Sequence, residues 1–140
     1  MDILDTLRIS ASGMTAQRVR LQTVASNMAN ARTTRTDEGG PYQRQMPVFS
    51  AEPTDTFGDM FERNISRVDV VDIETDDALG ASVYDPGHPD ADDNGYVLYP
   101  NVNILTEMVD MMTTSRTYEA NAQAASTTYK MAQHALGIGR

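Results

Sequence analysis

One acidic turn holds the side chains whose types and spacing come nearest to a chemical site. Asp90, Asp92 and Asn94, followed by a glycine, match the opening of a calcium-binding loop, D-x-[DN]-x-[DN]-G. The match then ends, because the twelfth position is Asn101 instead of a bidentate glutamate and because residues 96–99 indicate a strand instead of a helix. We therefore expect a polar turn whose side chains bond the neighbouring backbone, and we assign no metal ligand.

A histidine in the same turn suggests a second chemistry. His88 lies near Asp85 and Asp90, types that serve acid–base or metal sites. Such sites usually draw ligands from several separate elements, and the other histidine, His134, has no carboxylate near it in sequence. The chain also shows no phosphate loop, nucleophile elbow or dinucleotide fingerprint. The sequence predicts no enzyme, no catalytic residue and no cofactor, and a small metal-dependent enzyme at this turn stays the least favoured alternative.

Two long helices at the ends of the chain are the elements that must position everything else. In residues 103–137, apolar or small residues recur at alternating steps of four and three, which is typical of a coiled-coil seam. Residues 3–31 carry large apolar residues at steps of seven within a face wide enough for more than one neighbouring helix. The predicted assembly interface comprises Leu7, Met14, Leu21, Val24, Met28, Ile104, Met108, Met111, Tyr118, Ala122, Ala125, Tyr129, Ala132 and Leu136.

The ends of these helices carry local signals. Asp2 and Asn103 are suited to cap the two helix starts, and Gly137 is placed to follow the last turn of the second helix. Gly13 stands inside the first helix, where glycine costs about 1 kcal/mol relative to alanine. It marks either a close approach by another helix or a local weak point, and the sequence leaves both open.

Between the helices, the chain indicates a small and mostly antiparallel β region. Its predicted strands are residues 42–49, 65–73, 82–84 and 96–99, and residues 51–58 are expected to form a loop. Pro47 confines the first strand to an edge or a bulge. The expected fold is mainly α with a small β insertion: an N-terminal helix (1–31), an acidic, mostly β middle domain (32–103) and a C-terminal helix (104–140), with the two helices paired as a coiled coil.

Charge and composition exclude several classes of partner. Fifteen of the 20 acidic residues lie in residues 32–103, so the net charge of −9 belongs to the middle and the helices are nearly neutral. Nucleic acid would need a basic stripe, and a membrane-surface helix would need Lys and Arg along its polar face. The chain has no cysteine, no apolar run that could span a bilayer and no pattern of a cleaved secretory signal at its start. We expect neither nucleic-acid binding nor direct membrane insertion.

Three stretches resemble one family. ISASGMTAQRVRLQTVASNMANARTTRT is similar to the N-terminal signature of bacterial flagellar rod and hook proteins. GGPYQRQMPVF and YDPGHPDADDNGYVLYPNVNILTEMVDMMTTSRTYEANAQAASTTYKMAQHALGIGR resemble the proximal rod proteins of the flagellar basal body, the FlgC type within that axial family. Residues 50–83 lie outside these matches.

The resemblance implies a structural subunit that polymerises through its terminal helices into a hollow axial drive-shaft. It implies export by the flagellar type III apparatus without a cleaved signal, and a place in the periplasmic part of the basal body. The implied partners are copies of itself, other rod proteins, the MS-ring and export-gate side, and the distal rod. A coiled-coil adaptor or another secretion-system assembly protein remains the alternative. Stoichiometry distinguishes them, because an adaptor closes into a defined oligomer whereas head-to-tail rod contacts do not close.

Overall fold

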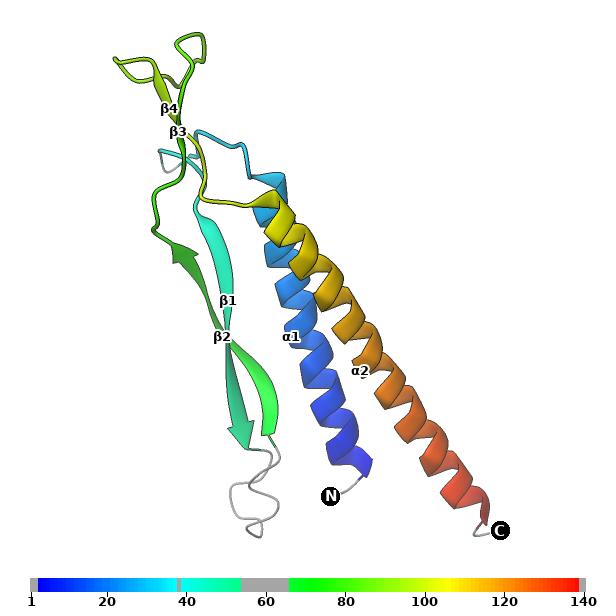
Figure 1. The fold of residues 1–140 in the computed structure, drawn as a ribbon. Coiled ribbons are helices and arrows are strands. Elements are labelled where there is room, and N and C mark those ends of the chain that lie inside the picture. Colours follow the sequence, from blue (N-terminus) through cyan, green and yellow to red (C-terminus); the bar gives the residue numbers. More distant parts are fainter. Residues whose placement is uncertain (1–2, 38, 54–65, 139–140) are drawn as a thin grey trace.

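The computed structural model describes residues 3–37, 39–53 and 66–138, which form an elongated molecule (Figure 1). The chain runs through α1 (Ile3–Ala29), β1 (Arg44–Pro53), β2 (Ser66–Asp76), β3 (Ser82–Tyr84), β4 (Tyr96–Leu98) and α2 (Ile104–Ile138). The two helices pack antiparallel, and α1 lies between α2 and the hairpin of β1 and β2, as Figure 1 shows. The predicted fold class, two paired terminal helices with a small antiparallel β region between them, is confirmed.

The helix starts and ends follow the local signals only in part. Asn103 caps α2 as predicted, since its Oδ1 accepts hydrogen bonds from the backbone N–H groups of Leu105 (3.0 Å) and Thr106 (3.3 Å). The prediction for Gly137 is wrong, because α2 continues through Ile138. Asp2 lies outside the described residues. α1 ends two residues before its expected end, in turns whose backbone bonds run from Asn30 to Ser26 and from Ala31 to Met28.

Gly13 marks a close approach of the two helices. A Cβ atom at this position would lie 2.9 Å from Nδ2 of Asn121, which projects from α2. Of the two roles that the sequence left open, the structure selects the close contact. Glycine leaves room here for the Asn121 side chain, which fills the space that a side chain at position 13 would otherwise take.

The Gly13–Asn121 contact makes a testable prediction about stability. Gly13→Ala is expected to change the free energy of unfolding by less than about 1 kcal/mol, because the gain in helix propensity is offset by displacement of Asn121. In an Asn121→Ala background the same substitution should stabilise the protein by about 1 kcal/mol. Urea unfolding of the four variants of this double-mutant cycle measures both effects. Equal effects of Gly13→Ala in the two backgrounds would contradict the contact.

The β region consists of two separate hairpins. β1 and β2 pair antiparallel, and their register shifts between Val48 and Phe49, next to Pro47. Proline cannot donate to a ladder, so the predicted bulge or edge position is borne out. The loop prediction is wrong for Ala51–Pro53, which continue β1 because they pair with Val68 to Ser66 of β2. The rest of that predicted loop lies outside the described residues.

The other strands lie close to their predicted positions. Ile65, where the second strand was expected to begin, lies outside the described residues, and β2 runs from Ser66 to Asp76, three residues beyond the predicted end. β3 has the predicted bounds, and β4 ends one residue early, at Leu98. Within the first hairpin, Arg67 and Glu52 form a cross-strand ion pair of 2.6 Å. This hydrogen bond and the nearby charge raise the pKa of the exposed Arg67 above its usual value.

The core is small and unusually polar. Its buried hydrophobic members are Ala16, Val24, Ala31 and Val97, whereas its buried polar members are Ser10, Thr23, Asn27, Glu107, Thr114 and Thr128. The buried hydroxyl groups of α1 and α2 donate to backbone carbonyls four residues earlier in their own helix, so they are satisfied without a partner across the interface. Small and self-satisfied side chains permit close packing, but they bury little apolar surface. No helix in the described ranges is long and apolar enough to cross a membrane.

Candidate assembly surface

The face of α2 that packs against α1 differs from the predicted seam. The buried residues of α2 are Glu107, Thr114 and Thr128, and the half-buried Asn121 completes the same row at steps of seven. This row is displaced by one residue from the predicted row that begins at Met108. One residue is about 100° of rotation on a helix, so the large side chains of the predicted row turn away from the centre of the α1 contact.

The predicted interface residues therefore fall into two groups. One group is covered inside the chain: Val24 is buried, and Leu7, Met14, Leu21, Met28, Met111, Ala122, Ala125 and Ala132 are half-buried. The other group is exposed and consists of Ile104, Met108, Tyr118, Tyr129 and Leu136. Tyr129 and Leu136 are 59% and 78% exposed. Whether either group touches another subunit stays a prediction.

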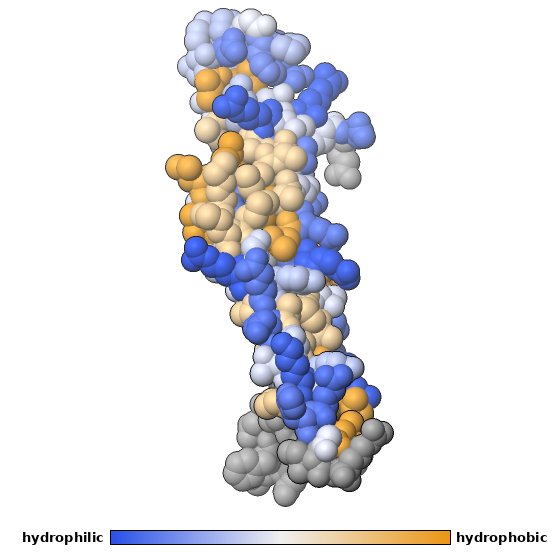
Figure 2. Space-filling model, turned by 90° about the vertical axis from the view of Figure 1, so that its right-hand side faces the viewer, coloured by the Kyte–Doolittle hydropathy of each residue, from blue (hydrophilic) through white to orange (hydrophobic). Residues whose placement is uncertain are grey.

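The first turns of α2 carry exposed hydrophobic residues that the seam prediction missed. Leu105 is 74% exposed, Val109 56% and Met112 57%. With Ile104 and Met108, which are also exposed, they make up what we call the α2 patch. Figure 2 shows hydrophobic residues gathered on the α2 side of the molecule. The sequence does contain a signal for these residues. Leu105, Val109 and Met112 form a second apolar row at steps of four and three, beside the predicted row.

A buried carboxylate joins the three layers at the start of α2. Glu107 is fully buried, with 0% of its surface exposed. Its Oε1 accepts a hydrogen bond of 2.8 Å from Nε of Arg44 on β1, and its Oε2 accepts one of 3.2 Å from Nδ2 of Asn27 on α1. Because a buried charge is tolerated only when it is paired and hydrogen-bonded, these contacts fix where α2 starts relative to α1 and the hairpin.

Asn27 carries the same junction into the β region. Its Nδ2 donates to the carbonyl oxygen of Gln45, and its Oδ1 accepts from the backbone N–H of Gln45 and from the hydroxyl of Tyr42, each at 2.9 Å. The amide therefore pairs with the backbone of β1 as a neighbouring strand would. We call Asn27, Arg44 and Glu107 the buried junction. Periodicity could not reveal it, since the sequence marks Glu107 only as an acidic residue in a first helical turn.

The acidic turn that resembled a calcium loop is held by its own hydrogen bonds. Asp92 Oδ1 accepts from the backbone N–H groups of Asn94 (2.9 Å) and Tyr96 (2.8 Å), as expected for an Asx turn. His88 Nδ1 accepts from the backbone N–H of Asp90 (3.1 Å). Asp90 Oδ2 accepts from the Thr34 hydroxyl at 2.8 Å. Within the described part of the chain, no group of three or more His, Asp or Glu residues is placed to hold a metal ion. Through the Thr34–Asp90 hydrogen bond, the turn connects the β3–β4 hairpin to the segment that follows α1.

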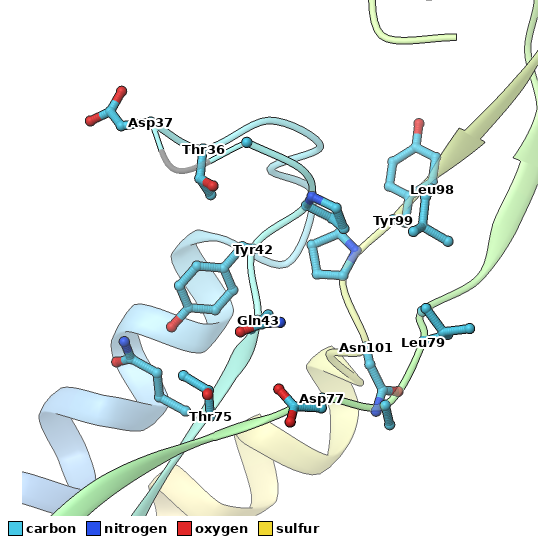
Figure 3. A pocket seen from close by; sticks show the side chains of 16 residues that line it. Thr36, Asp37, Tyr42, Gln43, Thr75, Asp77, Leu79, Leu98, Tyr99 and Asn101 are labelled. Atoms are coloured by element: carbon cyan, nitrogen blue, oxygen red, sulfur yellow. The ribbon is translucent and has the colours of Figure 1, made fainter. Parts of the chain in front are cut away.

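A cavity of about 560 Å³ lies between that linker, the end of β2 and the segment before α2 (Figure 3). Its walls mix polar and apolar side chains, among them Gln43, Asp77, Leu79 and Asn101. The Tyr42 hydroxyl points away from the cavity and donates a hydrogen bond to Asn27 Oδ1. Its described lining residues include the carboxylates of Asp37 and Asp77 and no histidine, lysine or arginine.

Comparison with known proteins places both helices in one family. A family model described as the flagella basal body rod protein matches residues 7–35, and one described as the flagellar basal body rod FlgEFG protein C-terminal matches residues 93–138. The flagellar basal-body rod protein FlgC of Borreliella burgdorferi is 38% identical over 99% of this chain and 98% of its own length. FlgC of Aquifex aeolicus is 44% identical over 91% of this chain and 90% of its own length, and FlgC of Bacillus subtilis is 40% identical over all of both chains. The matches extend through residues 50–83, where the motifs alone gave nothing. The chain therefore belongs to the FlgC family of flagellar basal-body rod proteins.

Proposed function

As a member of this family, the chain is a structural subunit of the flagellar basal-body rod, and we propose that it polymerises there through the uncovered faces of its terminal helices. The observation that carries the proposal is the placement of the large hydrophobic residues of α2. Small and polar side chains fill its contact with α1, while Met108, Tyr129 and Leu136 face solvent. Such side chains each stabilise a contact by about 1.5–3 kcal/mol when a neighbouring subunit buries them.

The order of layers supports an orientation for the subunit. α1 separates α2 from the β1–β2 hairpin (Figure 1). We propose that residues 1–31 and 104–140 build the wall of the central tube and that residues 32–103 face outward, where their acidity meets solvent. The 14 predicted interface residues are proposed to meet neighbouring helices, the covered ones by flanking the α1–α2 contact and the exposed ones directly.

The location and the partners follow from the family. The protein assembles with other rod components in the flagellar basal body. We further propose export by the flagellar type III apparatus without a cleaved signal, a position in the periplasm, and neighbours on the MS-ring and export-gate side and on the distal-rod side. We propose no catalytic role, because His88 and Asp90 are engaged in holding the tip. The alternative of a closed coiled-coil adaptor is not favoured, because the relatives named above are flagellar basal-body rod proteins.

Tyr129→Asp is the test of assembly through the exposed seam. The side chain is exposed in the single chain, so the fold should survive, whereas an unpaired carboxylate in a packed contact between subunits should not be tolerated. We expect at least roughly tenfold fewer completed basal bodies, the effect of about 1.4 kcal/mol per contact, in a strain whose native copy is deleted. The matched control is Gln123→Asp, which adds the same charge at an exposed position of α2 outside the seam. Equal assembly of the two variants would refute the proposal.

A further inference from the structure

The small side chains between α1 and α2 do not by themselves fix how far one helix lies along the other. The buried hydroxyl groups in this contact donate to carbonyls of their own helix and are satisfied in any register; they belong to Ser10, Thr23, Thr114 and Thr128. The inward row of α2 repeats at steps of seven, as Glu107, Thr114, Asn121 and Thr128. Seven residues are about 10 Å and almost two full turns, so a displacement by seven would return the same face of α2 to α1.

Two contacts show which register the molecule adopts. Asn27 Nδ2 donates to Oε2 of Glu107 at 3.2 Å, and Gly13 leaves room for Asn121. The partners are 14 positions apart on each helix, so both contacts belong to one antiparallel register. The glycine contact discriminates weakly between registers, because a displacement by seven would place a threonine, a shorter side chain, over Gly13.

The Glu107 contact discriminates strongly. The carboxylate is fully buried and is bonded to Arg44 at 2.8 Å as well as to Asn27. Both partners are held independently of α2, because Asn27 bonds the backbone N–H and carbonyl of Gln45, the residue that follows Arg44 on β1. In another register the carboxylate would lose these donors, and a buried charge without partners is strongly destabilising. A single polar residue in a packed helix contact can specify register in this way.

We propose that the buried junction is a register lock: Glu107 selects one register of α2 on α1 among several that the small side chains of the contact accept. The covalent connection leaves α2 free to move, since residues 77–103, which join β2 to α2, contain only the three-residue strands β3 and β4. A subunit displaced by seven residues would carry every exposed residue of α2 about 10 Å from its place. The junction thus determines which conformation forms, in addition to how stable that conformation is.

Moving the carboxylate by one step of seven tests the lock. The transfer variant combines Glu107→Thr with Thr114→Glu and so keeps the composition of the chain. Its carboxylate can reach Asn27 and Arg44 only if α2 moves by seven residues along α1. We expect the transfer variant to fold, with the helix content of the unchanged chain in circular dichroism, and to have α2 displaced by about 10 Å.

The displacement is measured as a distance between two spin labels in the purified full chain. The chain has no cysteine, so Gln22→Cys and Lys130→Cys, both at exposed positions, introduce the only labelling sites. Position 22 is nine residues beyond Gly13 and position 130 is nine beyond Asn121, in opposite directions, so roughly 27 Å separate them along the helices. Pulsed electron paramagnetic resonance should give a separation about 10 Å shorter in the transfer variant than in the labelled chain without it.

A second variant separates the choice of register from stability. Arg44→Met with Glu107→Leu removes both charges at similar volume, and Asn27 keeps its bonds to Gln45. Apolar replacement of a buried ion pair is often neutral or stabilising, so the Tm should not fall. We expect a second label distance, about 10 Å from the first, in at least roughly one molecule in ten. The control Thr23→Val removes a buried hydroxyl outside the junction and should keep the single distance of the labelled chain.

Three results would overturn the proposal. An unchanged label distance in the transfer variant would show that the carboxylate does not select the register. Loss of helix content in that variant would show that the helix contact accepts one register only, which leaves nothing to select. A single unchanged distance in Arg44→Met with Glu107→Leu would show that packing alone sets the register. The structural role in the rod is independent of these results, since Tyr129→Asp tests it separately.

Discussion

A chain that lacks Tyr129–Arg140 is expected to build no rod, although its remaining helices should still pair. The deletion removes the last ten residues of α2, almost three turns, together with the exposed Tyr129 and Leu136. It leaves the row that contacts α1, from Glu107 to Thr128, in place. Each lost large side chain removes about 1.5–3 kcal/mol from a contact between subunits. Because the loss recurs at every copy, a moderate defect in one contact prevents growth of the whole assembly.

Complementation of a strain without the gene measures this effect, scored by swimming and by counting basal bodies in electron micrographs. The control removes only Gly139 and Arg140, which follow α2. Circular dichroism of the purified proteins should show that the longer deletion keeps the helix content of α1 and of residues 104–128. If the long deletion still assembles rods as well as the control does, the terminal turns of α2 are not part of the assembly surface.

Loss of the buried carboxylate is expected to be the most destabilising single change inside the subunit. In Glu107→Ala, Arg44 and Asn27 lose the acceptor that holds them, and breaking a buried pair costs about 3–5 kcal/mol. The Arg44 side chain is still 22% exposed, so water compensates in part and we expect a value near 3 kcal/mol. For a chain of this size, that corresponds to a decrease in Tm of roughly 10 °C.

The Tm of Glu107→Ala, measured by thermal unfolding, is compared with the Tm of the control variant Glu119→Ala. Glu119 is an exposed acid on the same helix, and its removal is expected to change stability by less than about 0.5 kcal/mol. Glu107→Gln, which keeps the size and one acceptor, should lie between the two. A Tm of Glu107→Ala that equals that of Glu119→Ala would show that the buried junction does not hold α1, α2 and the hairpin together.

The periodic and local signals in the sequence determined the elements and the family. Steps of seven, and of four and three, predicted both long helices, since one face of each must be apolar for any packing partner. Asn103 predicted the start of α2 because its side chain satisfies backbone groups that are local in sequence. Pro47 predicted an edge or bulge position because it lacks a backbone N–H of its own. The motifs at both ends of the sequence are specific enough to indicate the family. Ala51–Pro53 escaped prediction because a pairing strand distant in sequence, and not its own composition, keeps that segment extended.

Only the tertiary structure decided which row of α2 faces α1. An apolar row shows that something must cover it, but it does not show whether that partner is the same chain or another. Here the more polar row turns inward, because Arg44 and Asn27 satisfy Glu107 there and Gly13 makes room for Asn121. The buried junction forms between residues as far as 80 positions apart, so no local sequence pattern could predict it. As a consequence, most of the large hydrophobic residues of α2 that the periodicity assigned to a seam are exposed on the surface of the single chain.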